Sequence, residues 1–212
     1  TVLATFKNKK FSKINKIKTN KKFFDLKIIN YFKDYSKKKN NNKICITSSV
    51  VPKLNFLIKK LSKKYKFKFY NLSLNNLPFK LKIKYNKKEI GADRIANIIA
   101  LNNYKFKNYI IIDFGTATTF DVIKNNVYEG GLIFPGINIS HNSLVENAAL
   151  LKKIKIQNIK KIVSNNTRES IQSGFYWGYL SLINGIISKI IYEKKIKPKI
   201  ILTGGLAKIF RS

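Results

Sequence analysis

The sequence predicts a mixed α/β fold built from two similar halves. Short apolar runs of strand length alternate with longer segments whose apolar residues recur at helical spacing. All ten glycines lie between Gly91 and Gly205, so the turns that bring backbone close to a ligand concentrate in the second half. With 212 residues, the chain is long enough to bury a substantial core.

The first half reads as strands alternating with amphipathic helices. We expect strands within 2–11, a helix over 23–35, a strand at 44–46, a helical stripe over 54–61, a strand at 67–70 and an extended piece at 81–85. The single cysteine, Cys45, excludes an internal disulfide and is expected to be a core thiol. A further helix follows, because Ile95 and Ile98 continue at helical spacing.

The second half combines a hairpin with long helices. We expect a strand at 109–112, a hairpin of 120–123 against 127–129, a turn at Gly130 and Gly131, a strand at 132–134, a helix entered through Pro135 and Gly136, a helix over 167–192 and a strand at 199–202. These elements suggest two domains, 1–104 and 105–212. The absence of methionine and the opening on Thr1 indicate an internal piece of a longer protein.

The formal net charge of +33 raises the possibility of nucleic-acid binding. Lysine supplies almost all of this charge, since arginine occurs only at positions 94, 168 and 211. Proteins that recognise specific base sequences depend on arginine for their base contacts. The lysines of this chain are spread along its length, as an AT-rich coding sequence would produce. We therefore expect no specific nucleic-acid partner. No apolar run approaches the ~20 residues of a membrane span, so no membrane role is expected.

The segment from Asp113 to Asp121 is the strongest local pattern. It follows the apolar run 109–112 and places a carboxylate, then Gly115, then Thr116 and further threonines at a strand end. Such a turn lets backbone approach a phosphate while hydroxyls donate hydrogen bonds. The alternative is an ordinary β-hairpin with a Gly-Thr turn.

The segment Gly91-Ala92-Asp93-Arg94 places an acid beside a base at the start of a helix. A helix N-terminus favours anionic ligands, so Asp93 could act as a general base while Arg94 holds a carboxylate or phosphate. Asp93 could equally cap the helix while Arg94 forms a surface ion pair. The residues alone do not decide between these two interpretations.

Three other positions carry weaker signals. Gly204 and Gly205 follow a predicted strand and are candidate nucleotide contacts, although Gly-Gly loops are common. Thr167 lies where a helix capped by Asn or Thr is expected to begin. His141, the only histidine, has no cysteine or histidine partner, so a metal role is not expected.

Taken in order, three motifs resemble those of type III pantothenate kinase: Gly91-Ala92-Asp93-Arg94, the segment Asp113-Phe114-Gly115-Thr116-Ala117-Thr118-Thr119-Phe120-Asp121, and the segment Tyr128-Glu129-Gly130-Gly131-Leu132-Ile133-Phe134-Pro135-Gly136. The resemblance covers about residues 80–205. It implies the actin-like ATPase fold, with two ribonuclease-H-like domains and ATP in the cleft between them. It also implies phosphorylation of pantothenate with ATP, Mg²⁺ and a monovalent cation, K⁺ or NH₄⁺, by a cytoplasmic homodimer.

The resemblance assigns roles to individual residues. Asp93 matches the general base, the segment 91–94 and Thr167 match substrate contacts, Thr116 matches an ATP contact, and Asp113 matches the monovalent-cation ligand. Gly115, Gly204 and Gly205 are further candidate ATP contacts, because they lie in loops that follow predicted strands. Tyr85 is the candidate substrate tyrosine, although it lies one residue closer to Gly91 than is usual in the family.

Two features leave other interpretations open. The family's first phosphate motif, Asp-x-Gly-Asn-Thr, is absent, so we expect this chain by itself to bind Mg-ATP poorly. A non-catalytic protein, either kinase-like and regulatory or basic and nucleic-acid-binding, is the competing class. The helix over 167–192 carries a long apolar stripe interspersed with Gly174, Gly178 and Gly185, which predicts a dimer interface. The alternative interpretation is a helix packed entirely in the core of one chain.

Overall fold

The computed structural model describes residues 2–7, 10–17, 24–37, 43–49, 51–77, 82–101 and 107–211. The chain divides into two compact units. The first comprises residues 1–76 with 91–93, and the second comprises residues 77–90 with 94–212. The predicted mixed α/β architecture is confirmed in both units. The predicted division into domains 1–104 and 105–212 stays a prediction.

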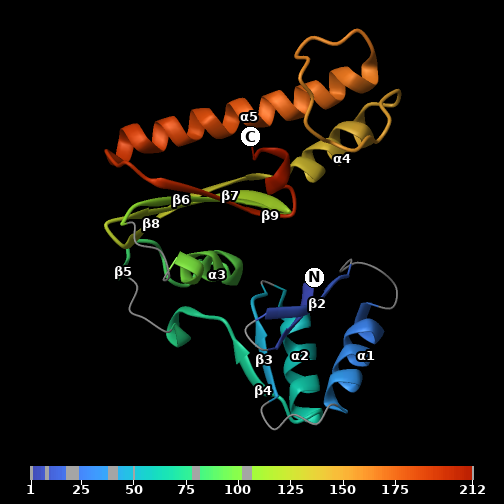
Figure 1. Cartoon of the computed structure of the whole chain (residues 1–212), viewed down its shortest axis with the longest axis vertical. Coiled ribbons are helices and arrows are strands. Elements are labelled where there is room, and N and C mark those ends of the chain that lie inside the picture. Colours follow the sequence, from blue (N-terminus) through green and yellow to red (C-terminus); the bar gives the residue numbers. More distant parts are fainter. Residues whose placement is uncertain are drawn as a thin grey trace. The chain divides into compact units, whose positions relative to one another are not determined.

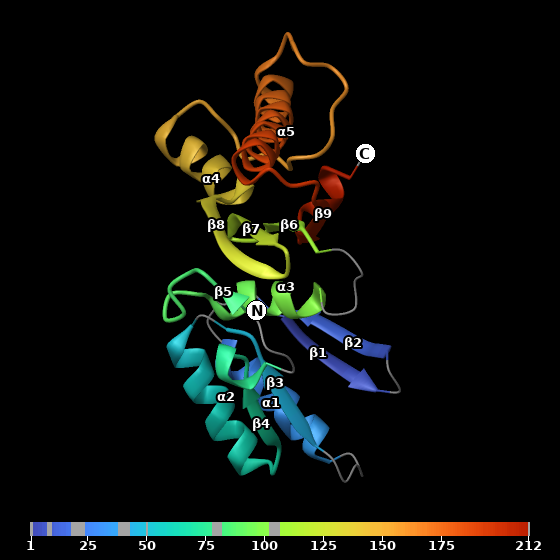
Figure 2. The ribbon, with the colours of Figure 1, turned by 90° about the vertical axis from the view of Figure 1, so that its left-hand side faces the viewer.

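The first unit packs two helices against short strands (Figure 2). Its elements are β1 (Val2–Lys7), β2 (Lys10–Lys16), α1 (Phe24–Ser36), β3 (Ile44–Thr47), α2 (Pro52–Lys64), β4 (Lys68–Asn71) and the 3₁₀ turn η1 (Leu74–Asn76). Strands β1 and β2 pair antiparallel, whereas β3 and β4 pair parallel. These elements match the predicted ones, apart from positions 8, 9 and 23, which lie outside the described residues.

The core of the first unit forms where the apolar stripes of α1 and α2 meet. Ile28 and Phe32 of α1 pack with Leu54, Ile58 and Leu61 of α2. Helix α2 begins at a proline, whose fixed φ suits the first helical turn and whose missing N–H costs nothing there. Cys45 lies partly buried at the edge of this cluster, as predicted, and burial raises the pKa of its thiol.

The second unit is a five-stranded sheet with helices on both faces (Figure 1). Its elements are β5 (Lys82–Ile83), α3 (Ala92–Ala100, whose first two residues belong to the first unit), β6 (Tyr109–Phe114), β7 (Ala117–Lys124), β8 (Val127–Pro135), α4 (Ile137–Asn147), α5 (Thr167–Lys194), β9 (Lys199–Gly204) and the 3₁₀ turn η3 (Ala207–Ile209). The strand order is β5-β8-β7-β6-β9. Strands β6, β7 and β8 form an antiparallel meander, and β9 pairs parallel with β6.

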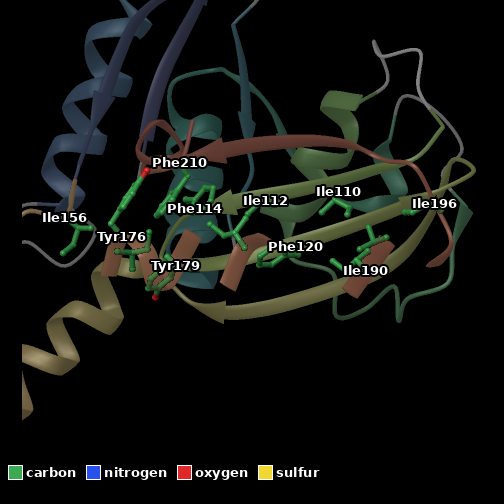
Figure 3. Close-up of a cluster of buried hydrophobic side chains, with 13 residues drawn as sticks. Ile110, Ile112, Phe114, Phe120, Ile156, Tyr176, Tyr179, Ile190, Ile196 and Phe210 are labelled. Carbon is green, nitrogen blue, oxygen red and sulfur yellow. The ribbon is translucent and has the colours of Figure 1, made fainter. Parts of the chain in front are cut away.

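The side chains of β6 and β7 alternate between two different environments. Ile110, Ile112 and Phe114 of β6, with Phe120 and Val122 of β7, join the apolar cluster under α5 (Figure 3). Successive residues of a strand point to opposite faces, so Asp113 and Asp121 lie on the other face, towards α3. Because helices cover both faces of the sheet, nearly all residues of β6 are apolar, as the sequence shows.

Helix α5 matches the helix predicted over 167–192 and extends it by two residues. Its N-terminus is capped by Asn166, whose side-chain oxygen accepts a hydrogen bond from the backbone N–H of Glu169 at 3.0 Å. Tyr176, Tyr179 and Ile183 are buried against the sheet. The interpretation of α5 as a core helix is therefore correct for this face.

The turn predicted at Gly130 and Gly131 is wrong. Strand β8 runs without interruption from Val127 to Pro135, and its register against β7 shifts at Glu129, which has no partner residue opposite. This is a β-bulge. Gly130 adopts φ +113°, which side chains disfavour. A Cβ at Gly131 would lie 1.7 Å from the carbonyl oxygen of Phe120. Glycine serves here to bend a strand and not to end it.

The bulge provides a stability test with a matched control in the same unit. Gly131→Ala should destabilise the fold by at least about 2 kcal/mol, because the new methyl group has to displace the backbone of β7. Gly185→Ala, on an open part of α5 with no atom within 4 Å of the new Cβ, should instead stabilise it by about 0.5–1 kcal/mol. Urea unfolding of the two variants measures both effects, and a Gly131→Ala protein as stable as the wild type would contradict the close packing of the bulge against β7.

Candidate active site

Helix α3 carries the Gly91–Arg94 motif at its N-terminal end. Ala92 is its first residue, and Asp93 is exposed in its first turn, where the helix dipole favours a negative charge. The backbone oxygen of Ala92 accepts a hydrogen bond from the hydroxyl of Ser48 at 2.8 Å. An exposed carboxylate in this position is accessible to a bound substrate, as a general base must be.

Arg94 forms a buried ion pair and not a surface one. Its Nε donates to Oδ1 of Asp121 in β7 at 2.6 Å, and the two side chains are 5% and 0% exposed. The predicted alternative, a surface ion pair, is therefore wrong. The hydroxyl of Tyr128 in β8, itself fully buried, donates to the same carboxylate oxygen at 2.8 Å. The site thus contains one desolvated cation, one desolvated anion and a neutral donor.

The electrostatics of this group are set by burial and by the charge of Asp121. Burial of Arg94 disfavours its cation, but the adjacent carboxylate outweighs that cost, and the pKa of the guanidinium is raised above its usual value. Burial, and then the charge of Asp121, raises the pKa of the Tyr128 hydroxyl. Both shifts keep the protons in place, so the two donors persist throughout the physiological pH range.

Tyr85 joins this group from the loop after β5. Its ring lies 5.5 Å from the guanidinium of Arg94, and the ring of Tyr128 lies 5.8 Å from it, so the cation has two aromatic neighbours. The two rings meet edge to face at 6.0 Å. The structure therefore brings together two of the predicted substrate residues, Arg94 and Tyr85.

Asp113 lies near the end of β6, beside the loop that follows β9. Its Oδ2 accepts a hydrogen bond from the side-chain amide of Asn97 in α3 at 3.0 Å. Gly204, with φ +90°, approaches so closely that a Cβ there would lie 2.5 Å from Oδ1 of Asp113. Because β6 and β9 run parallel in register, Phe114 pairs with Gly204 and both strands end at the same edge of the sheet.

The predicted nucleotide residues share this edge. Gly115 and Thr116 form the exposed two-residue connection between β6 and β7, so the segment is also the β-hairpin that was the alternative interpretation. The backbone oxygen of Thr116 accepts from the N–H of Gly136 at 3.1 Å, which fixes the turn. Gly205 is exposed just after β9. Exposed glycine backbone and a hydroxyl are suited to phosphate contact.

Thr167 lies apart from the Arg94 group and the Asp113 edge. It lines a groove of about 830 Å³ on the second unit, together with the polar residues 164–166 that precede α5. The walls are apolar and include Phe134, Leu144 and Leu182, and Gly174 and Gly178 lie along its α5 side. No residue of α3, β6 or β9 lines this groove.

Three residues of the site had been given no role from the sequence: Asn97, Asp121 and Tyr128. Asp121 ends the segment singled out from the sequence, and a signal for its burial was present. It is a lone acid between two apolar residues, Phe120 and Val122, in a strand whose alternate positions are core. An acid in such a position requires a buried partner.

Two properties of the described residues bear on ligands. No group of three or more His, Cys, Asp or Glu side chains gathers closely enough in the described ranges to hold a metal ion. None of the helices in those ranges combines the length and the apolar character that crossing a membrane requires.

Comparison with known proteins identifies the family. A sequence model described as "Type III pantothenate kinase" matches residues 1–189. The type III pantothenate kinase of Pelagibacter ubique (strain HTCC1062) is 42% identical over 201 residues, which span 94% of this chain and 77% of that protein. That of Sulfurihydrogenibium sp. (strain YO3AOP1) is 51% identical over 172 residues, which span 80% of this chain and 68% of that protein.

A solved structure supports the fold. The crystal structure of a putative Baf family transcriptional activator from Campylobacter jejuni matches with a TM-score of 0.55 at 23% identity, over 84% of this chain and 75% of that one. At this identity the likeness concerns the fold alone. The predicted fold class, α/β of the actin-like ATPase kind with ribonuclease-H-like domains, is confirmed. The order of the motifs, the matching family model and relatives of 42% and 51% identity together show that this chain belongs to the type III pantothenate kinase family.

Proposed function

We propose that this protein performs the ATP-dependent phosphorylation of pantothenate to 4′-phosphopantothenate, the first step of coenzyme A biosynthesis, with Asp93 as the general base. Membership of the family supports the reaction and does not favour a non-catalytic or nucleic-acid-binding role. The observation that carries the role of Asp93 is its exposed position in the first turn of α3, directly before the buried Arg94.

Phosphoryl transfer requires little covalent chemistry from the protein beyond alignment and charge neutralisation. Asp93 accepts the proton of the primary hydroxyl of pantothenate as that oxygen attacks the γ-phosphorus of ATP, and ADP leaves. Residues 91–94 form the substrate-binding segment, because N–H groups at a helix start attract an anion such as the pantothenate carboxylate. Tyr85, beside Arg94, is a further substrate contact in this proposal. Thr167, which lies apart from this group, is assigned to the substrate from the resemblance to the family alone.

ATP is assigned to the edge of the sheet where β6 and β9 end. Gly115, Thr116, Gly204 and Gly205 offer backbone and a hydroxyl to its phosphates, and three of them are glycines at an exposed edge. The family implies a divalent metal, Mg²⁺. Because Mg²⁺ binds through substrate phosphates and only one or two carboxylates, the sparse donors of the described residues fit an ion that arrives with the nucleotide.

Asp113 is assigned to the monovalent cation, K⁺ or NH₄⁺. Its carboxylate lies at the same edge as the phosphate-binding residues, and carboxylate oxygen is a suitable ligand for a hard cation. The hydrogen bond from Asn97 to Oδ2 orients the carboxylate of Asp113. The other oxygen, Oδ1, then lies on the side of Gly204. We also propose that the enzyme acts in the cytoplasm, in keeping with its membership of a family of biosynthetic kinases.

Replacement of the proposed base tests the mechanism. Asp93→Asn in the intact enzyme should lower kcat by about 10²–10⁴-fold, since proton removal is lost while the shape of the side chain is kept. ATP affinity, measured by calorimetry, should change little. Asp25→Asn is the matched control, because Asp25 is also exposed in the first turn of a helix. Near wild-type turnover in Asp93→Asn would remove Asp93 as the base.

We further propose that the enzyme is a homodimer in which a second copy covers the groove at Thr167. Beside the groove, the exposed face of α5 carries Gly174 and Gly178, at which an added Cβ would meet no atom outside the backbone of α5 within 4 Å. Glycine on a helix face lets another helix approach closely, and the groove beside it is mostly apolar. A second α5 of the same chain fits this surface.

Substitution on this face tests the dimer. Gly178→Leu should shift the protein towards monomer in sedimentation velocity, because the side chain would fill the space that the second copy needs. Asn184→Leu is the matched control, since Asn184 is exposed on α5 and does not line the groove. A wild-type enzyme that is monomeric and fully active would contradict the proposal.

A further inference from the structure

The buried charges beneath α3 are costly and require an explanation beyond stability. Arg94 and Asp121 are both desolvated, and such pairs are often no more stabilising than apolar residues of similar volume. Asp121 lies in β7 between Phe120 and Val122, which pack into the apolar core on the opposite face. A chain selected for stability alone could place an apolar residue at position 121. The pair is therefore expected to fix a geometry.

The geometry around Arg94 is unusually constrained. A single oxygen of Asp121 accepts both from Nε of Arg94 at 2.6 Å and from the hydroxyl of Tyr128 at 2.8 Å. Bonding through Nε, close to the aliphatic stem, restricts the rotation of the guanidinium plane. The rings of Tyr85 and Tyr128 lie 5.5 and 5.8 Å from the guanidinium carbon and limit its remaining freedom.

Strand β8 is shaped around this group. A Cβ at Gly131 would lie 2.9 Å from Nη2 of Arg94, and a Cβ at Gly130 would lie 3.0 Å from the ring of Tyr85. The bulge at Glu129 places these two glycines beside the arginine and the tyrosine. The Gly-Gly pair therefore has a second role besides bending the strand, because it leaves room for the side chains that surround Arg94.

The constraint on Arg94 is also a constraint on α3. Arg94 is the third residue of the helix, and Asn97, one turn later on the same face, donates to Asp113 of β6 at 3.0 Å. Two polar side chains thus attach the first two turns of α3 to neighbouring strands of the sheet. Asp93 directly precedes the first of these attachments and shares its helical turn.

We propose that Asp121 and Tyr128 are positioning residues for phosphoryl transfer, which act through Arg94 to hold the first turn of α3 and, with it, the carboxylate of Asp93. Neither residue touches the substrate in this proposal, since both are fully buried. The proposal rests on the proposed function, in which Asp93 is the base. A displacement of about 1 Å at a reacting group can cost about a hundredfold in rate, so a loosened turn should be measurable.

Tyr128→Phe tests this proposal, because it removes one hydroxyl and keeps the ring beside Arg94. Hydrogen exchange of the α3 backbone amides should become faster in the variant, with kcat lowered about ten- to a hundredfold and KM for ATP unchanged. Tyr31→Phe is the matched control, since it removes a hydroxyl that is hydrogen-bonded to Thr5 at 2.6 Å, far in sequence from the motif. In the control, exchange in α3 and kcat should both stay at wild-type values.

Asp121→Asn provides the second variant, because it keeps the shape of the side chain and removes its charge. It should accelerate exchange in α3 and lower kcat more than Tyr128→Phe does. Unchanged exchange in α3 in both variants would overturn the proposal, and so would faster exchange with unchanged kcat. Failure of the proposed function would appear separately, as a wild-type enzyme without pantothenate phosphorylation, or as full turnover in Asp93→Asn. The exchange measurement needs no substrate and decides the anchoring of α3 in either case.

Discussion

The ion pair between Arg94 and Asp121 is the interaction on which the candidate active site depends. It joins the first turn of α3 to the middle strand of the sheet, and both charged side chains are buried. A buried charge left without its partner is strongly destabilising, so neither residue can be lost alone without a penalty. Tyr128 satisfies the same carboxylate oxygen, and the glycines of the bulge leave space for the cation. A helix start that carries a proposed base is thereby attached to β7, the middle strand of the sheet.

The two faces of the sheet have different roles. Towards α5, alternate residues of β6 and β7 form an apolar core that stabilises the unit, since each fully buried large apolar side chain contributes about 1.5–3 kcal/mol. Towards α3, the intervening positions carry Asp113 and Asp121, which accept from Asn97 and Arg94. Strand alternation therefore separates packing from polar function within the same few residues, and it explains why acids occur inside an otherwise apolar run.

Much of this fold could be predicted from periodicity, and the site only in part. The apolar runs and helical stripes located the long elements, because burial on one or two faces leaves a clear pattern. The turn predicted at Gly130 and Gly131 was wrong, because glycine occurs in turns and in β-bulges alike. Only the pairing of β8 with β7 distinguishes the two. Arg94 as a surface ion pair was also wrong, because its partner lies 27 residues away on a strand that local sequence does not connect to α3. Motif order identified the family, whereas the contacts that orient the motif required the tertiary structure.

A double-mutant cycle on Arg94→Met and Asp121→Leu measures the central interaction directly. Each single change leaves one buried charge without its partner and should cost about 3–5 kcal/mol in urea unfolding. The double variant replaces the pair with apolar side chains and should be far less destabilised than the sum of the two single variants. Coupling of at least about 2 kcal/mol is the expected result. Additive single effects would contradict the account, because they would mean that Arg94 and Asp121 do not hold α3 to the sheet through each other.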